Sequence, residues 1–228
     1  DKINKFDYKE LKDVFDLCLS CKACASECPS NVDIAALKAE FLHQYYKTNK
    51  PTLRTKLFAD NVKYNKLGSV FPFLTNIALN NVITKKVLGI ATQRSIPKLY
   101  KTTLKKWYKR NVDQLHSKEF KNGEVYIFCD EFTNYYDVTI GIDAIELLTQ
   151  LGYKVLIINH EESGRSAISK GFLDKAKVVI DKNIEIFKNL ISEEKPLIGI
   201  ESSAILGFRD EYIRLADDKI SAKNISKN

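Results

Sequence analysis

The chain has 228 residues, of which 44% are hydrophobic and 29% are charged, so it can bury the core of one large domain or of two small ones. No apolar run approaches the roughly 18 residues that a membrane-spanning helix needs, and the polar start of the chain lacks the apolar core of a signal peptide. We therefore expect a cytoplasmic protein. The sequence contains no Met, from which we expect it to be part of a longer polypeptide with a larger function.

The net charge of +7 is unevenly distributed along the chain. Residues 47–110 contain 15 Lys and Arg side chains against a single acid, Asp60. A basic block of this length favours an acidic partner domain or the anionic inner face of a membrane, where it would make a peripheral contact. A solvated face that neutralises a negative cluster explains the block equally well. We expect no nucleic-acid partner, because no nucleic-acid-binding motif accompanies the lysines.

The first half of the chain is predicted to be helical. Residues 7–18 open with a capping-box pattern at Asp7 and continue with apolar residues at helical spacing. Asp33 is placed to cap a second helix. Residues 51–93 are interrupted by glycine and proline and lack strand-like alternation, which favours short helices. Residues 98–110 predict a basic helix whose apolar side packs on its neighbours.

After Gly123 the pattern changes to short apolar strands separated by amphipathic helices. Strands are predicted at residues 124–129, 153–158 and 196–200, and their alternation with helices implies right-handed crossovers and a parallel sheet. The predicted fold class is therefore α+β and multidomain: a helical, ferredoxin-like cysteine module, followed by an α/β half with a parallel sheet. The predicted regions are a cysteine module at residues 1–50, a basic helical region at 51–122, the α/β half at 123–216 and a polar, frayed tail at 217–228.

Four of the five cysteines gather near the start of the chain. Cys18, Cys21, Cys24, Cys28 and Pro29 form a C-x2-C-x2-C-x3-C-P run, which is the spacing of the cluster-binding loop of bacterial ferredoxins. The sequence therefore predicts that these four cysteines are metal ligands of [4Fe-4S] chemistry, with Cys18, Cys21 and Cys24 on one cluster. In two-cluster ferredoxins the fourth cysteine ligates the other cluster, so we expect Cys28 to serve a neighbouring cluster.

Four thiolates could instead bind zinc or form disulfides. Structural zinc sites usually pair two C-x2-C knuckles across a longer spacer, which this run lacks. Disulfides would leave one of the five cysteines over, and nothing in the sequence indicates secretion. An iron–sulfur site is favoured, and zinc is the alternative.

Two stretches resemble large bacterial FAD-linked oxidases. Residues 6–58, above all LCLSCKACASECPSNVDIAALKAEFLHQYYK, resemble the iron–sulfur part of these flavoproteins. Residues 124–212 resemble the first half of their cysteine-rich domain, through VYIFCDEFTNYYD and GIESSAILGFRDEY. The group includes relatives of glycolate oxidase, D-lactate dehydrogenase and D-2-hydroxyglutarate dehydrogenase. The FAD domain, an upstream cysteine motif and a second cysteine-rich repeat have no counterpart in the sequence.

The resemblance implies an electron-transfer segment of a flavin-dependent 2-hydroxy-acid dehydrogenase, with no complete active site in this chain. Electrons would pass from FAD, on a separate domain or subunit, through [4Fe-4S] to an acceptor such as a quinone. The partners are then the FAD-binding domain or subunit and that acceptor, with residues 47–110 available for membrane contact. The alternative is a structural or docking module of a multisubunit oxidoreductase, such as a heterodisulfide-reductase-like complex, with no redox role of its own.

Polar residues follow the second and third predicted strands. Because the carboxyl ends of parallel strands form a ligand crevice, we expect these two loops to lie side by side, where they could bind a hydroxy acid. Helix capping by Ser163 and Ser202, with ion pairing of Arg165 and Arg209, is the simpler and favoured interpretation. Cys129 ends a buried strand and is expected to act as a small hydrophobe. The candidate crevice residues are His160, Glu162, Ser163, Arg165, Glu201 and Ser202.

Overall fold

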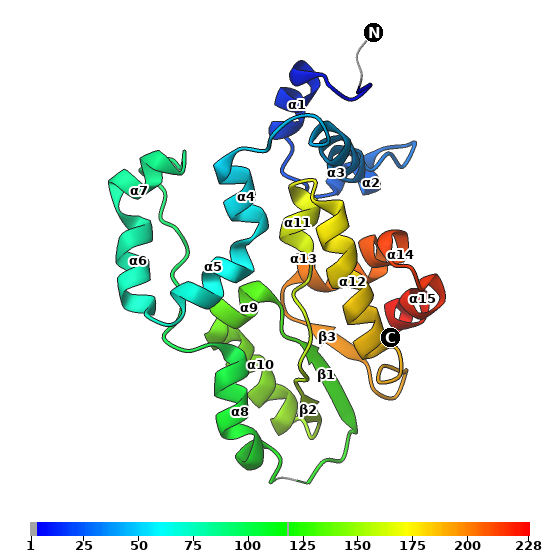
Figure 1. Cartoon of the computed structure of the whole chain (residues 1–228). Coiled ribbons are helices and arrows are strands. Elements are labelled where there is room, and N and C mark those ends of the chain that lie inside the picture. The colour runs from blue at the N-terminus through cyan, green and yellow to red at the C-terminus, as the bar shows by residue number, and fades with distance from the viewer. Residues whose placement is uncertain (1–3, 118) are drawn as a thin grey trace. The chain divides into compact units, whose positions relative to one another are not determined.

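The structure is a computed structural model that describes residues 4–117 and 119–228 (Figure 1). The chain packs as two units, each built from two stretches. One unit runs to Asn61 and includes Gly164–Val178, and the other contains Val62–Ser163 and Val179–Asn228. The four predicted regions are consecutive stretches of sequence, whereas each packed unit combines two separate stretches. The predicted regions therefore remain a prediction.

The first unit is helical and is held by aromatic packing on one helix. Phe41 is buried, and the rings of Phe15 and Tyr45 lie against it with centroids 5.2 and 5.8 Å away. Gly171 has a φ of +76°, and a Cβ at this position would come within 2.4 Å of the Leu42 Cβ, so the close approach requires glycine. The helices of this unit are α1 (Lys9–Asp16), α2 (Ala23–Glu27), α3 (Ile34–Tyr45), α4 (Leu53–Ala59), α11 (Arg165–Ser169) and the first part of α12 (Leu173–Phe187).

The two expected helix caps of this unit have different outcomes. The Asp33 carboxylate accepts a hydrogen bond from the Ala36 N–H at 2.9 Å, which confirms the cap of α3. The capping box at Asp7 is wrong, because α1 has no side-chain cap. The Asp7 carboxylate instead accepts a hydrogen bond from the Asn49 side chain at 2.8 Å, a partner that is distant in sequence.

The helical stretch of the second unit agrees with the expected short helices. It contains α5 (Asn61–Gly68), α6 (Pro72–Asn80) and α7 (Val82–Val87), followed by the basic helix α8 (Leu104–Leu115). Helix α8 begins later than predicted because Thr103 caps it, accepting from the Lys106 N–H at 3.3 Å. Leu104 is fully buried and Trp107 packs against the same core, so the apolar side of this helix docks on its neighbours as expected.

The sheet of the second unit is three-stranded and parallel, which confirms the α/β prediction. It contains β1 (Glu124–Phe128), β2 (Lys154–Leu156) and β3 (Leu197–Gly199) in the order β2-β1-β3. Val125 pairs with Val155, and Ile127 pairs with Ile198. The accompanying helices are α9 (Glu131–Tyr135), α10 (Val138–Gln150), the later part of α12, α13 (Ser202–Ile205), the 3₁₀ turn η1 (Leu206–Arg209), α14 (Glu211–Leu215) and α15 (Lys219–Lys227).

The C-terminal segment differs from the frayed tail that the sequence predicts. Its residues form α15, where the Asp218 carboxylate accepts from the Ser221 N–H at 2.9 Å. Ala222 and Ile225 are buried, so a few apolar residues in a polar segment are enough to dock the helix. No helix in the described part of the chain is both long enough and apolar enough to cross a membrane.

Candidate functional site

The cysteine run forms a loop between α1 and α3 that is wrapped around the short helix α2. Cys24 lies inside α2 and Cys28 ends it. Cys21 is exposed, and the other three loop cysteines are partly exposed. All four are free thiols. Their sulfur atoms are therefore unbonded to one another and lie at or near the surface of the loop.

The backbone of this loop adopts conformations that ordinary residues avoid. Ser20, Lys22 and Asn31 have φ values of 56°, 63° and 50°. The left-handed region costs a non-glycine residue about 1–2 kcal/mol, so the surrounding contacts must hold these three residues there. Backbone strain of this kind concentrates at sites that bind ligands or change state.

The turns of the loop direct backbone N–H groups at its sulfur atoms. The Ser20 N–H donates to Cys18 Sγ at 3.4 Å, and the Ile34 N–H donates to Cys24 Sγ at 3.3 Å. Backbone N–H groups, first those of Val32 and Ser30, hold the pKa of the Cys28 thiol below its ordinary value. Hydrogen bonds to sulfur favour the thiolate, which is the form that binds metal.

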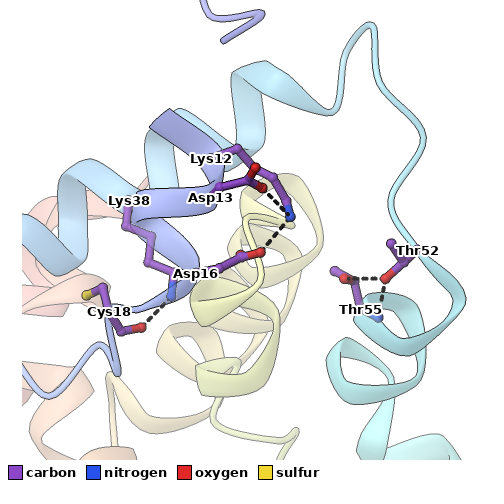
Figure 2. Close-up of polar contacts among 7 residues, drawn as sticks. All are labelled: Lys12, Asp13, Asp16, Cys18, Lys38, Thr52 and Thr55. Atoms are coloured by element: carbon purple, nitrogen blue, oxygen red, sulfur yellow. Dashed lines mark hydrogen bonds and ion pairs between the residues drawn. The ribbon is translucent and has the colours of Figure 1, made fainter. Parts of the chain in front are cut away.

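Two cations from other elements fix the start of the loop. The Lys38 Nζ of α3 donates to the Cys18 carbonyl oxygen at 2.6 Å (Figure 2). The Arg165 Nη2 of α11 donates to the Ser20 carbonyl oxygen at 2.6 Å. Lys38 is only 6% exposed, so this positive charge is held beside the loop rather than in solvent.

The sulfur atoms nevertheless do not form a metal centre in this conformation. Across residues 4–117 and 119–228, no three His, Cys, Asp or Glu side chains lie together in a way that could hold a metal ion. Four thiols with backbone N–H groups at their sulfur atoms are the ligand type of an iron–sulfur cluster, but their sulfur atoms are not gathered around one point. Binding a cluster would require the cysteine side chains to move toward one another.

The candidate crevice residues are not arranged as the sequence predicts. Because β1 lies between β2 and β3, the loops that follow β2 and β3 are separated by the end of β1. The expectation that they lie side by side is wrong. Cys129, Asp130 and Glu131 follow β1, and all three are buried.

Glu131 is the partner of Ser163, and the sequence reasoning missed it. The Ser163 N–H and hydroxyl donate to the two carboxylate oxygens of Glu131 at 2.9 and 2.7 Å. Burial raises the pKa of Glu131 to about 7, although the hydrogen bonds from Ser163 oppose the shift. The sequence feature that could have indicated Glu131 is the Asp130-Glu131 pair, which begins one residue after the buried strand β1 ends.

His160 is buried in the same region and is bonded on both sides of its ring. Nε2 accepts from the Cys129 N–H at 3.1 Å, and Nδ1 lies 2.6 Å from the Glu161 carbonyl oxygen. Burial lowers the pKa of His160 to about 3, with a further contribution from Lys105, so the ring is neutral. Burial also raises the pKa of the Cys129 thiol to about 12, in keeping with a small hydrophobe rather than a ligand.

The remaining candidates serve the backbone or belong to the other unit. The Glu162 carbonyl oxygen accepts from the Asn183 side chain at 2.8 Å. Glu201, rather than the exposed Ser202, caps α13 by accepting from the Ala204 N–H at 2.8 Å. Arg165 lies in the first unit. These bonds within the protein favour a structural role for the residues after the strands.

The chain is similar to D-2-hydroxyglutarate dehydrogenases. It is 27% identical over 219 residues to that of Haemophilus influenzae, which covers 92% of this chain and 21% of the relative. Its identity to the Escherichia coli enzyme is 27% over 221 residues, which cover 92% of this chain and 22% of the relative. Its identity to the Pseudomonas putida enzyme is 23% over 229 residues, which cover 89% of this chain and 21% of the relative. No family model and no solved structure matches the chain. Along nearly its whole length, the chain thus corresponds to about a fifth of the length of these dehydrogenases.

Proposed function

We propose that this chain is the electron-transfer segment of a flavin-dependent 2-hydroxy-acid dehydrogenase and that its cysteine loop binds a [4Fe-4S] cluster. The observation that carries the proposal is the C-x2-C-x2-C-x3-C-P run with backbone hydrogen bonds aimed at its sulfurs. Its occurrence in a chain similar to D-2-hydroxyglutarate dehydrogenases supports an oxidoreductase context.

The chain's own residues would prepare the loop for the cluster. The N–H groups stabilise thiolates, while Lys38 and Arg165 hold the backbone at Cys18 and Ser20. When bound, a [4Fe-4S] cluster accepts and releases single electrons at a potential set by its surroundings. Because metal binding and local folding are coupled, the cysteine side chains would draw together only as the cluster forms.

The parent protein would supply the other parts of the activity. An FAD-binding domain or subunit would oxidise the hydroxy acid, and an acceptor such as a quinone would receive the electrons. The basic stretch at residues 47–110 would face an acidic surface of that parent protein or an anionic membrane.

Anaerobic reconstitution of the 228-residue chain with iron and sulfide tests the proposal. We expect broad visible absorption and, after reduction, the electron paramagnetic resonance signal of a [4Fe-4S] cluster, both lost in air. Cys21→Ser should abolish both signals, while Cys129→Ala, a buried cysteine outside the loop, should keep them. Cys28→Ser should keep most of the signal, because we expect Cys28 to serve a neighbouring cluster, and loss of the signal would assign all four cysteines to one cluster. A folded chain that stays colourless would contradict the proposal.

A structural or docking module is the second candidate, because the four thiols are not gathered as a metal site in the part of the chain that the structure describes. In that case Cys21→Ser would leave assembly with the parent oxidoreductase unchanged. The same reconstitution separates the candidates, since the docking module would fold and assemble without iron.

A further inference from the structure

A polar cavity of about 250 Å³ lies in the first unit, beside the start of the cysteine loop. A single water needs only about 10–15 Å³ of such space, so the cavity has room for a ligand of several atoms. Two lysines line it, Lys38 from α3 and Lys170 from the end of α11. The hydroxyl-bearing residues that line it are Ser20, Tyr46, Thr55 and Ser169.

Both lysines are held near the cavity with their charge only partly compensated. Lys38 uses one N–H on the Cys18 carbonyl oxygen (Figure 2), and an ammonium group has three donors. The Lys170 Nζ lies 5.8 Å from the centroid of the Phe58 ring. Burial lowers the pKa of Lys170, and the neighbouring charges of Lys38 and Arg54 lower it further.

The one acid that lines the cavity is already engaged. Asp16 accepts from the Lys12 Nζ at 2.5 Å, and Asp13 lies 3.6 Å from the same Nζ (Figure 2). Among the described residues, neither Lys38 nor Lys170 forms an ion pair with a carboxylate. The charged residues that line the cavity are therefore two lysines and one acid that is already paired with Lys12, so the cavity has an excess of positive charge.

We propose that this cavity binds a small dianion whose oxygens accept hydrogen bonds from Lys38 and Lys170. Gathering like charges away from water is costly unless a counter-charge joins them, and charge-assisted hydrogen bonds to an anion offset that cost. The ligand class is therefore inorganic phosphate or a short dicarboxylate, which share two negative charges and several acceptor oxygens. This site does not depend on a cluster in the cysteine loop.

Isothermal titration of the 228-residue chain with phosphate, and separately with succinate, at constant ionic strength tests the proposal. We expect one site for at least one of the two dianions, and the one that binds more tightly identifies the source. Lys170→Gln and Lys38→Gln should each weaken binding about tenfold or more, because each removes a charge-assisted bond. Lys56→Gln removes an exposed charge from α4 in the same unit and should leave the affinity within about twofold.

Two further results decide the interpretation. Cys21 does not line the cavity, so Cys21→Ser should retain anion binding although it abolishes iron uptake, and failure of this site and failure of the cluster proposal are distinguishable. Lys170→Gln carries the test if Lys38→Gln fails to fold, because the Lys170 side chain, unlike that of Lys38, donates no hydrogen bond to the described backbone of the loop. The proposal is overturned if neither dianion binds, or if Lys170→Gln binds as tightly as the unaltered chain.

Discussion

The cysteine loop and the residues that follow the strands are both polar, but they satisfy their polar groups in opposite ways. In the loop, partly exposed thiols receive backbone hydrogen bonds from a chain held in left-handed conformations. After the strands, Glu131, His160 and Ser163 are buried and bonded to the protein itself. Polar groups that are buried and paired specify a fold, whereas strained backbone beside accessible thiols is typical of a binding site. The sequence presents both regions as candidate sites, and the difference in burial separates them.

The largest expected effect tests the structural half of this comparison. Asn183 is fully buried, accepts from the Glu161 N–H and donates to the Glu162 carbonyl oxygen and to the Tyr212 hydroxyl. Asn183→Ala leaves these groups without their partner, so we expect the free energy of unfolding to fall by about 4 kcal/mol in urea denaturation. Asn224→Ala, at an exposed position in α15, should change it by less than about 0.5 kcal/mol. Equal effects of the two substitutions would contradict the structural role.

A second effect comes from the buried carboxyl group of Glu131. Its pKa is raised from 4.5 to about 7 in the folded chain, so between these values the folded state binds more protons than the unfolded state. The free energy of unfolding should therefore fall as the pH rises through this window, by up to about 3 kcal/mol. Glu131→Gln cannot ionise and should remove that part of the pH dependence. Urea unfolding of both proteins at about pH 5 and about pH 8 measures the difference, and identical pH profiles would contradict it.

A third effect should appear in iron retention rather than in stability. Arg165 holds the Ser20 carbonyl oxygen at the start of the loop, and groups that orient metal ligands typically change metal affinity 10–100-fold, so we expect Arg165→Gln to weaken iron retention about tenfold. The free energy of unfolding should fall by no more than about 1 kcal/mol. Arg209→Gln removes an exposed arginine of the second unit and provides the control. Equal iron loss from both variants would show that Arg165 has no specific role.

The smallest effect concerns the backbone of the loop. Asn31 is exposed and has a φ of 50°, a conformation that glycine adopts freely and β-branched residues avoid. Asn31→Gly should change the free energy of unfolding by less than about 0.5 kcal/mol, while Asn31→Val should lower it by about 1 kcal/mol. The same urea titration measures both. Equal stability of the Gly and Val variants would argue against the left-handed conformation.

Local patterns in the sequence predict much of the fold. The three apolar runs mark the strands, and the carboxylate of Asp33 marks the start of α3. The order of the strands is not local, because it depends on the edge to which each crossover returns. The sequence pattern therefore predicts neighbouring loops after β2 and β3, although β1 lies between these strands. The docking of α15 also depends on packing against η1 and α14, in a segment where Ala222 and Ile225 are buried.

For the cysteine loop, the sequence predicts the ligand residues but not the side chains that hold the loop in place. Fixed spacing identifies the four cysteines, but it carries no information about Lys38 and Arg165, which bond to the loop from 20 and 145 residues away. Glu131 was missed for a similar reason, because its partner Ser163 is 32 residues distant. Such pairs are set by packing, and no pattern within either segment indicates them.

The content of iron and acid-labile sulfide in the chain, after anaerobic reconstitution and removal of unbound metal, tests the central claim most directly. The account predicts iron and sulfide in equal amounts in the unaltered chain and in Cys129→Ala, and neither in Cys21→Ser. A folded chain that retains no iron, or that retains iron equally well in Cys21→Ser, would contradict it.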